Sequence, residues 1–432
     1  MSRPSLVTRL ARIERIEQLA EARSETPATP AASAVAHAPE LPFAVEQTPE
    51  GPLHVRTLRL SGAHQVGRAP VMPARSALSE LLALLALDPA LASCPLEGAL
   101  YLDTETTGLG PAAGTIAFLV GLAFWDADSL VVEQLLVRQL GEEAPMLARV
   151  TDRIRSSSML VTFNGKSFDM PVLRTRFVMA KLPLPSELPH LDLLHVARRV
   201  HKARSFGFRL GALERHVLGF VRENDVPSSE VGAYYLHFLR TGDARALTSV
   251  VEHNALDVVS MVALVGLYGE SLEDTELGAI DLVGVARTLK RAGLIERAYE
   301  VASVASERGG GADAIRARGE IAKARGDKAR AMADFESLAE QVDEPAIRLE
   351  LAKLYEHHAK DAARALATAL AGTGEVAPRW KRRTDRLRAK VAKVHHANQV
   401  QRSEALQTSF RCVEEVALQV ASKERKKHAR EL

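Results

Sequence analysis

Apolar residues along this chain follow two spacings, which predict where strands and helices form. Short apolar runs predict four strands at residues 98–102, 115–125, 130–137 and 159–163. Helical spacing predicts helices at residues 142–156, 171–181, 191–202 and 209–218, and a long helix after residue 243. Three strands, a helix, a fourth strand and further helices indicate an α/β fold with a mixed sheet and flanking helices.

The N-terminal segment has a weaker pattern. Apolar residues at positions 6, 10, 13 and 16 keep helical spacing and predict an amphipathic helix. An organellar transit peptide is the alternative for this arginine-rich start. Residues 24–52 are rich in Ala, Pro, Thr and Glu and have no sustained apolar period. We therefore expect residues 1–52 to comprise this helix and a disordered linker.

Two short elements are predicted between the linker and the first strand of the α/β region. Near-alternation of apolar residues at 53–66 predicts a small β element. The Leu-rich segment 76–87 predicts a helix that leads into the strand at 98–102.

Beyond about residue 274 the chain becomes Ala-rich and helical, with an internal repeat. Gly293 and Gly326 are 33 residues apart, and Asp327 and Asp361 are 34 residues apart. A period of this length is typical of tetratricopeptide repeats, in which small residues let paired helices pack closely. We expect such repeats at 274–377; an irregular array of helical hairpins is the alternative.

Residues 378–432 form the most basic part of the chain. Cations recur from Arg379 to Lys393 and again from Lys423 to Arg430. A helix of this composition could bind phosphates, with Trp380 as a stacking surface. A solvated helix with interspersed charge is the alternative.

Composition excludes few functions. With 432 residues the chain can form two or three domains, and a net charge of +2 does not by itself indicate a nucleic-acid-binding protein. Cys94 and Cys412 are too far apart in sequence to suggest a disulfide framework, so a reducing cytoplasm is the expected location. We expect no membrane span, because no apolar run approaches the roughly 18 residues required.

The first candidate chemical group follows the strand at 98–102. Asp103 and Glu105 alternate along the chain, so in a strand they project from one face. Two carboxylates on one face repel each other unless a cation lies between them, and Mg²⁺ and Mn²⁺ prefer oxygen ligands. The pair therefore suggests a metal site, although a solvated turn is the alternative for this short pattern.

Two later segments supply further candidate ligands. Asp169 precedes a predicted helix, where the helix dipole favours an anion. His253 and Asp257 are four residues apart in the long predicted helix and so share a face.

Strand D-x-E, then N-G-x-x-F-D, then helical H-x-x-x-D resembles the DEDD exonucleases of the ribonuclease H-like superfamily, and the YprB-type family in particular. The supporting motifs are Thr115–Gly121, Phe163–Asp169, His190–His195, Asp225–Pro227 and His253-Asn254. The resemblance covers about residues 98–269. It implies a ribonuclease H-like domain, expected at 53–273, followed by the all-α tetratricopeptide-like region.

The resemblance also implies roles for the acidic residues. It implies two ions, Mg²⁺ or Mn²⁺, with Asp103 bridging both. Glu105 and Asp257 would complete the site of the ion that holds the attacking water, and Asp169 would serve the second ion through waters. His253 would be the general base or would orient the attacking water. The spacing of four between His253 and Asp257 departs from the five usual in the His subclass and matches the Tyr subclass, with His in place of Tyr.

Residues beside these motifs are candidates for substrate contact. They are Thr106, Thr107, Asn164, Lys166 and Phe168. We interpret Gly165 as the residue that permits a sharp turn and Asp192 as a helix cap, not a fifth ligand. His195 and His201 are expected at the surface.

The predicted function is therefore metal-dependent 3′→5′ exonuclease activity, on single-stranded DNA ends in repair. RNA turnover and a non-catalytic nucleic-acid-binding scaffold are the alternatives. The helical repeats are expected to bind a protein partner. We consider a helicase, because the chain has no Walker loop with which to separate strands itself.

Overall fold

The computed structural model describes residues 41–108, 110, 114–223 and 225–428. The predicted N-terminal helix and most of the predicted linker lie outside these described residues. The chain divides into two compact units, Met1–Arg308 and Gly309–Leu432. The boundary between the two units lies after Arg308, so the first pair of helices in the predicted repeat region, 274–377, belongs to the first unit. The domain bounds given above stay predictions.

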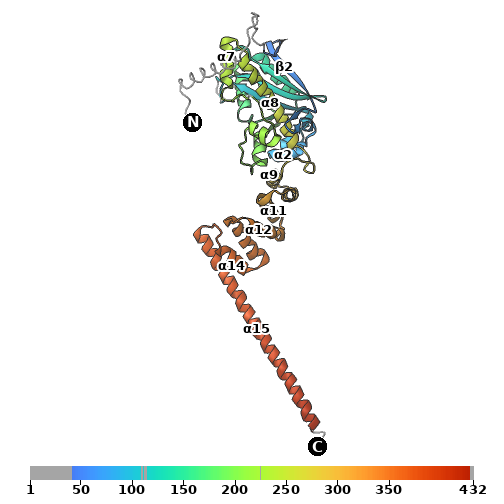
Figure 1. The fold of residues 1–432 in the computed structure, drawn as a ribbon, viewed down its shortest axis with the longest axis vertical. Coiled ribbons are helices and arrows are strands. Elements are labelled where there is room, and N and C mark those ends of the chain that lie inside the picture. The colour runs from blue at the N-terminus through green and yellow to red at the C-terminus, as the bar shows by residue number, and fades with distance from the viewer. Residues whose placement is uncertain (1–40, 109, 111–113, 224, 429–432) are drawn as a thin grey trace, which may run out of the picture. The chain divides into compact units, whose positions relative to one another are not determined.

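The first unit is built on a seven-stranded mixed sheet in the order β1-β2-β7-β6-β5-β8-β9 (Figure 1). Its strands are β1 (Ala44–Thr48), β2 (Gly51–Ser61), β5 (Ala99–Thr106), β6 (Ala117–Asp126), β7 (Ser129–Leu136), β8 (Met159–Thr162) and β9 (His190–Asp192). Strand β5 lies between β6, which is antiparallel to it, and β8, which is parallel to it. The mixed sheet with flanking helices is the fold expected from the sequence.

The four strands predicted from apolar runs are confirmed, and three differences concern the short or polar segments. Strand β1 lies inside the region predicted to be linker, because pairing with β2 orders a segment that has no apolar period of its own. The β element predicted at 53–66 covers most of β2, which begins two residues earlier and joins the main sheet. Strand β9 was predicted as the start of a helix; it has three residues, too few to show alternation.

Helices cover both faces of the sheet, which explains the nearly continuous apolar sequence of β6. On one face, α3 (Ala144–Arg155) and α4 (Asp169–Met179) pack on a core that includes Leu102 and Leu122. The other face is covered by α7 (Val231–Thr241) and α8 (Arg245–Tyr268) (Figure 1), whose core includes Leu119 and its cross-strand partner Leu136. Successive strand residues therefore alternate between two buried faces.

Helix α8 corrects one expectation. Its stretch Leu247–Tyr268 is long and apolar enough to cross a membrane by length and composition, although no such stretch was identified from the sequence. Because 78% of its most apolar window is buried inside the protein, the stretch has the properties of a core helix. It crosses the sheet and brings His253 and Asp257 to β5.

The helix predicted at 209–218 consists of a short α-helix and a π-helical turn. These are α6 (Leu210–Leu213) and η4 (Glu214–Leu218). The turn packs closely on the hairpin of β3 (Gln65–Val66) and β4 (Ala69–Pro70): a Cβ on Gly67 would lie 2.2 Å from Leu218 O. The other helices of this unit are α2 (Ser79–Ala86), α5 (Leu193–Val200), α9 (Ala279–Arg291) and α10 (Ile295–Glu307).

His201 is buried, not at the surface as the sequence suggested. Its Nδ1 lies 2.8 Å from Asp281 Oδ1 and its Nε2 lies 2.9 Å from Tyr268 OH. These contacts join the end of α5 to α8 and α9, and they satisfy both ring nitrogens.

The second unit is a run of helices: α11 (Gly311–Arg325), α12 (Lys328–Gln341), α13 (Pro345–Leu354) with the π-helical η5 (Tyr355–Ala359), α14 (Ala362–Leu370) and α15 (Ala377–His428). The repeated residues mark the turns between paired helices. Gly326 ends α11 at φ 96°, and the Asp327 and Asp361 side chains cap α12 and α14. The helical character is as expected, while the tetratricopeptide assignment stays a prediction.

The start of α15 packs on this unit, and this changes the interpretation of its basic residues. Trp380 donates its indole N–H to Ala369 O at 2.9 Å, which gives the ring a structural role. Arg386 and Lys390 pair with the buried Glu356, each through a contact of 2.8 Å. Part of the basic character therefore balances acidic groups within the unit.

Candidate metal-binding active site

Strand β5 supplies the first two carboxylates. Asp103 and Glu105 share the face of the sheet that α8 covers, and the side chain of Glu105 is largely buried. A β-bulge between Glu105 and Thr106 ends the regular pairing with β6 directly after this pair.

Asp169 reaches the same strand end from the opposite face. It is the first residue of α4, and its Oδ1 accepts hydrogen bonds from Thr104 N at 3.0 Å and Thr104 Oγ1 at 2.6 Å. Because Thr104 lies between Asp103 and Glu105 in β5, these bonds bring the third carboxylate next to the first two.

A polar row across the sheet orients Asp103. Asp103, Gly121 and Gln134 are cross-strand partners on β5, β6 and β7. Asn254 of α8 lies over Gly121, donates to Asp103 Oδ2 at 2.9 Å and accepts from Gln134 Nε2 at 2.9 Å. A Cβ on Gly121 would lie 2.3 Å from Asn254 Oδ1, so only glycine leaves space for this arrangement.

Helix α8 completes the site with His253 and Asp257. His253 Nε2 lies 3.6 Å from Asp257 Oδ2 and 4.0 Å from Glu105 Oε1. One ligand atom from each of these three residues lies within 4.8 Å of the others, which is a geometry that could hold a metal ion. Asp103 and Asp169 adjoin this group of three without belonging to it.

Burial and mutual repulsion make the carboxylates costly to ionise together. Burial, with repulsion from Asp257 and Asp169, raises the pKa of Asp103 well above its usual range. The same causes raise the pKa of Glu105 to about 8, although His253 opposes the shift, and burial raises that of Asp169 to about 6. A cation among these oxygens would relieve the repulsion, so the donor set fits a hard divalent ion.

His253 is held by an acidic partner outside the predicted motif. Its Nδ1 lies 2.6 Å from Asp225 Oδ1. Burial disfavours the charged ring, but the carboxylates of Asp257, Glu105 and Asp225 outweigh burial and raise the pKa of His253.

Arg222 adds a cation beside the site. Its side chain contacts Asp257 Oδ1 and pairs with the buried Glu214, and its Nη1 lies 3.1 Å from His253 Nδ1.

The hydroxyls of the candidate substrate-binding threonines have local partners. Thr106 Oγ1 donates to Gly108 O at 2.6 Å, and Thr107 Oγ1 accepts from Ile116 N at 3.0 Å. Both bonds stabilise the loop after β5. Substrate contact through these residues stays a prediction.

The turn after β8 is built differently from the sequence interpretation. The left-handed residue is Asn164, at φ 67°, whereas Gly165 is required because a Cβ there would lie 2.5 Å from the Thr162 side chain. Asp192 caps α5, as expected, and also accepts from Asn164 N at 2.8 Å. Phe168 is half-buried directly before Asp169.

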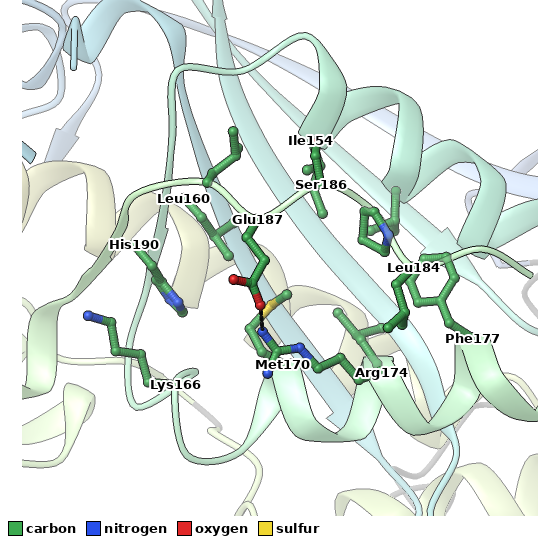
Figure 2. Close-up of a pocket in the computed structure, with 14 residues that line it drawn as sticks. Ile154, Leu160, Lys166, Met170, Arg174, Phe177, Leu184, Ser186, Glu187 and His190 are labelled. Atoms are coloured by element: carbon green, nitrogen blue, oxygen red, sulfur yellow. Dashed lines mark hydrogen bonds and ion pairs between the residues drawn. The ribbon is translucent and has the colours of Figure 1, made fainter. Parts of the chain in front are cut away.

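A cavity of about 360 Å³ adjoins this turn (Figure 2). Its floor is formed by core residues such as Leu160, Leu173 and Phe177, and polar side chains stand at its rim. Figure 2 shows Lys166 near His190 on one side and the Arg174–Glu187 ion pair across the cavity. Lys166, a predicted substrate contact, therefore borders this cavity, and its Nζ lies 3.7 Å from Asp88 Oδ2.

Several residues of the site were not assigned a role from the sequence. They are Thr104, Gly121, Gln134, Glu214, Arg222, Asp225 and Asn254. Gly121, Asp225 and Asn254 stand in motifs that carried the resemblance, which was the one signal available for them.

Comparison with known proteins finds similarity in the same segment of the chain that holds the candidate site. Residues 100–268 match the RNase H superfamily. The chain is also similar to the "Uncharacterized protein YprB" of Bacillus subtilis (strain 168), at 38% identity over 166 residues. That match covers 38% of this chain and 40% of the relative, so the chain spans less than half the length of the relative it matches.

Proposed function

Residues 100–268 are a ribonuclease H superfamily domain, and from this we propose that the protein is a metal-dependent nuclease of the DEDD type. One observation carries the proposal. Carboxylates from β5, α4 and α8 meet at one strand end, with Glu105, His253 and Asp257 close enough to share an ion. A superfamily with nuclease activity and an acidic site at this position support each other.

The metal would be Mg²⁺ or Mn²⁺, as two ions held by Asp103, Glu105, Asp169 and Asp257. Such ions neutralise charge on the phosphate and lower the pKa of a bound water. The contribution of the protein is to hold these carboxylates in position. Thr104 and Asn254 hold two of the carboxylates in place through the hydrogen bonds described above.

His253 is proposed to accept the proton of the attacking water at Nε2. Two groups compete for Nδ1: the carboxylate of Asp225, which can only accept when ionised, lies 2.6 Å away, and Arg222 Nη1, which can only donate, lies 3.1 Å away. Because Asp225 is the closer partner, we assign the ring proton to Nδ1. Nε2, which faces Glu105 and Asp257, is then the basic atom. Asp225 would therefore orient the ring and support the imidazolium that forms.

The finer proposal is 3′→5′ cleavage of single-stranded DNA ends in repair, in the cytoplasm. The polarity and substrate rest on the resemblance, and RNA turnover is the second candidate. The presence of all four carboxylates favours an enzyme over a non-catalytic scaffold. A protein partner, for which a helicase is our hypothesis, would bind the helical repeats.

The test uses the full chain with 5′-labelled DNA and RNA, single- and double-stranded, in Mg²⁺, Mn²⁺ or EDTA. We expect a ladder that shortens from the 3′ end, absent in EDTA and in Asp103→Asn. Asp126→Asn, which changes an exposed carboxylate paired with Arg59, is the matched control and should retain activity.

Equal cleavage by wild type and Asp103→Asn would refute the site assignment. Internal cuts on circular substrates would refute the exonuclease assignment and leave the metal site standing. Full activity in His253→Ala would remove only the proposed role as base. Co-purification that yields only nonspecific proteins would refute the helicase hypothesis.

A further inference from the structure

Arg222 is a buried cation for which the proposed chemistry gives no role. Its side chain is 5% exposed, and its Nε donates to Glu214 Oε2 at 2.8 Å. Its Nη2 contacts Asp257 Oδ1, and its Nη1 lies 3.4 Å from the backbone oxygen of His253. A planar guanidinium with partners on both sides has a fixed orientation.

The partner that anchors Arg222 is itself rigid. Glu214 is 1% exposed at its side chain and also accepts from Ser260 Oγ of α8 at 2.5 Å. It begins the η4 turn, which Arg68 holds from the β3–β4 hairpin by a backbone bond to Leu218 O at 2.8 Å. The position of Arg222 is therefore determined by the core and not by the site.

The two oxygens of Asp257 have different surroundings. Oδ1 is held by Arg222, while Oδ2 lies 3.6 Å from His253 Nε2, on the side of Glu105. A free aspartate on a helix could rotate about its side-chain bonds and offer either oxygen. The contact of Arg222 with Oδ1 fixes the side chain, so that Oδ2 is the oxygen that faces Glu105.

We propose that Arg222 is a positioning residue that holds Asp257 Oδ1 and so directs Oδ2 into the metal position shared with Glu105. This inference rests on the proposed nuclease function, because it assigns a way of building that same site. Hydrogen-bond partners behind metal ligands typically contribute about 10–100-fold to metal affinity or activity.

A competing effect has the opposite sign. A cation beside a metal site repels the metal, so loss of Arg222 would raise metal affinity if repulsion dominated. We expect positioning to dominate, because the buried Glu214 already balances the charge of Arg222. The direction of the change in affinity therefore decides between the two effects.

The experiment measures binding of Mn²⁺ alone to the full chain by electron paramagnetic resonance, without nucleic acid. We expect Arg222→Gln to weaken Mn²⁺ binding by about 10–100-fold and Arg222→Lys to weaken it less. The double variant Glu214→Gln/Arg222→Gln keeps the net charge of the pair, and it should also bind weakly. Arg215→Gln, an exposed arginine of the same turn, is the control for loss of one charge.

A second readout separates positioning from a purely structural role. The rate of cleavage by Arg222→Gln should rise towards the wild-type rate as Mn²⁺ approaches saturation. Circular dichroism identifies unfolded variants, and Arg222→Lys, which keeps the buried charge, provides the test if Arg222→Gln does not fold.

Unchanged or tighter Mn²⁺ binding in folded Arg222→Gln or Arg222→Lys would overturn the inference. If the wild type binds Mn²⁺ and Asp103→Asn does not, the metal site stands, and unchanged binding in Arg222→Gln then overturns this inference alone. If the wild type neither binds Mn²⁺ nor cleaves any substrate, the proposed function fails and this inference fails with it.

Discussion

At the scale of single residues, Asp103 has a position that suits function and costs stability. Its carboxylate is enclosed with three others, and burial and repulsion raise its pKa well above the usual range. A group whose pKa is raised by folding destabilises the folded protein increasingly as the pH rises above its unfolded pKa of about 4.

We predict that Asp103→Asn raises the melting temperature of the metal-free protein. The amide oxygen can still accept the bond from Asn254, while the repulsion is removed. The increase in melting temperature should be small at pH 4 and larger at pH 8. Each kcal/mol of stabilisation corresponds to roughly 2–4 °C. Calorimetry in EDTA measures it.

Added Mn²⁺ should make the wild type more stable than Asp103→Asn. Binding to the folded state stabilises the wild type, and the variant has lost a ligand. A variant that remains the more stable protein in saturating Mn²⁺ would contradict the placement of Asp103 among the ligands.

Gly121 carries a second prediction at this scale. Gly121→Ala places a methyl group against Asn254, so it should displace the partner of Asp103. We expect cleavage to fall about 10–100-fold and stability to fall by about 1–3 kcal/mol. Gly207→Ala, where the added methyl group meets open space, should leave both unchanged.

At the scale of elements, the second unit depends on an ion cluster between η5 and α15. Glu356 is buried, and its hydrogen bond to Arg386, strengthened by Lys390, lowers its pKa to about 2. The stabilisation is therefore fully present above the unfolded pKa of about 4.5 and is lost as the pH falls towards 2.

We predict that Glu356→Gln loosens α15 at neutral pH, and that wild type and variant become alike near pH 2. Trp380 reports this event, because its indole bonds to Ala369 across the same packing. The chain has two tryptophans, so Trp125→Phe leaves Trp380 as the single fluorophore. Identical fluorescence of wild type and Glu356→Gln at neutral pH would contradict the role of the cluster.

At the scale of the whole molecule, every residue of the candidate site lies in the first unit, between β5 and the end of α8. The partners Gln134, Glu214 and Arg222 lie in the same span. We predict that a chain ending at Arg308 folds and cleaves a short oligonucleotide at the rate of the full chain.

The measurement compares cleavage rates in Mn²⁺ for the two chain lengths, with circular dichroism to verify folding. A folded but inactive shorter chain would show that the second unit contributes to catalysis. Equal rates would support its proposed role in binding a partner.

Local patterns in the sequence predicted most of the strands and helices and singled out the candidate carboxylates, whose role as ligands stays a prediction. Alternation places Asp103 and Glu105 on one face of a strand, and the helical period places His253 beside Asp257, wherever the rest of the chain lies. Apolar runs likewise predicted β6 and β7 within a few residues. These features depend on neighbours in the sequence.

Only the tertiary structure decided how the site is supported. Asn254 reaches Asp103 because three strands align Gly121 beside Gln134, and Arg222 reaches Asp257 because a π-helical turn packs on a distant hairpin. The pairing of β1 with β2 and the burial of His201 also result from tertiary packing. Each depends on the register and packing of segments far apart in the chain, which no local spacing encodes.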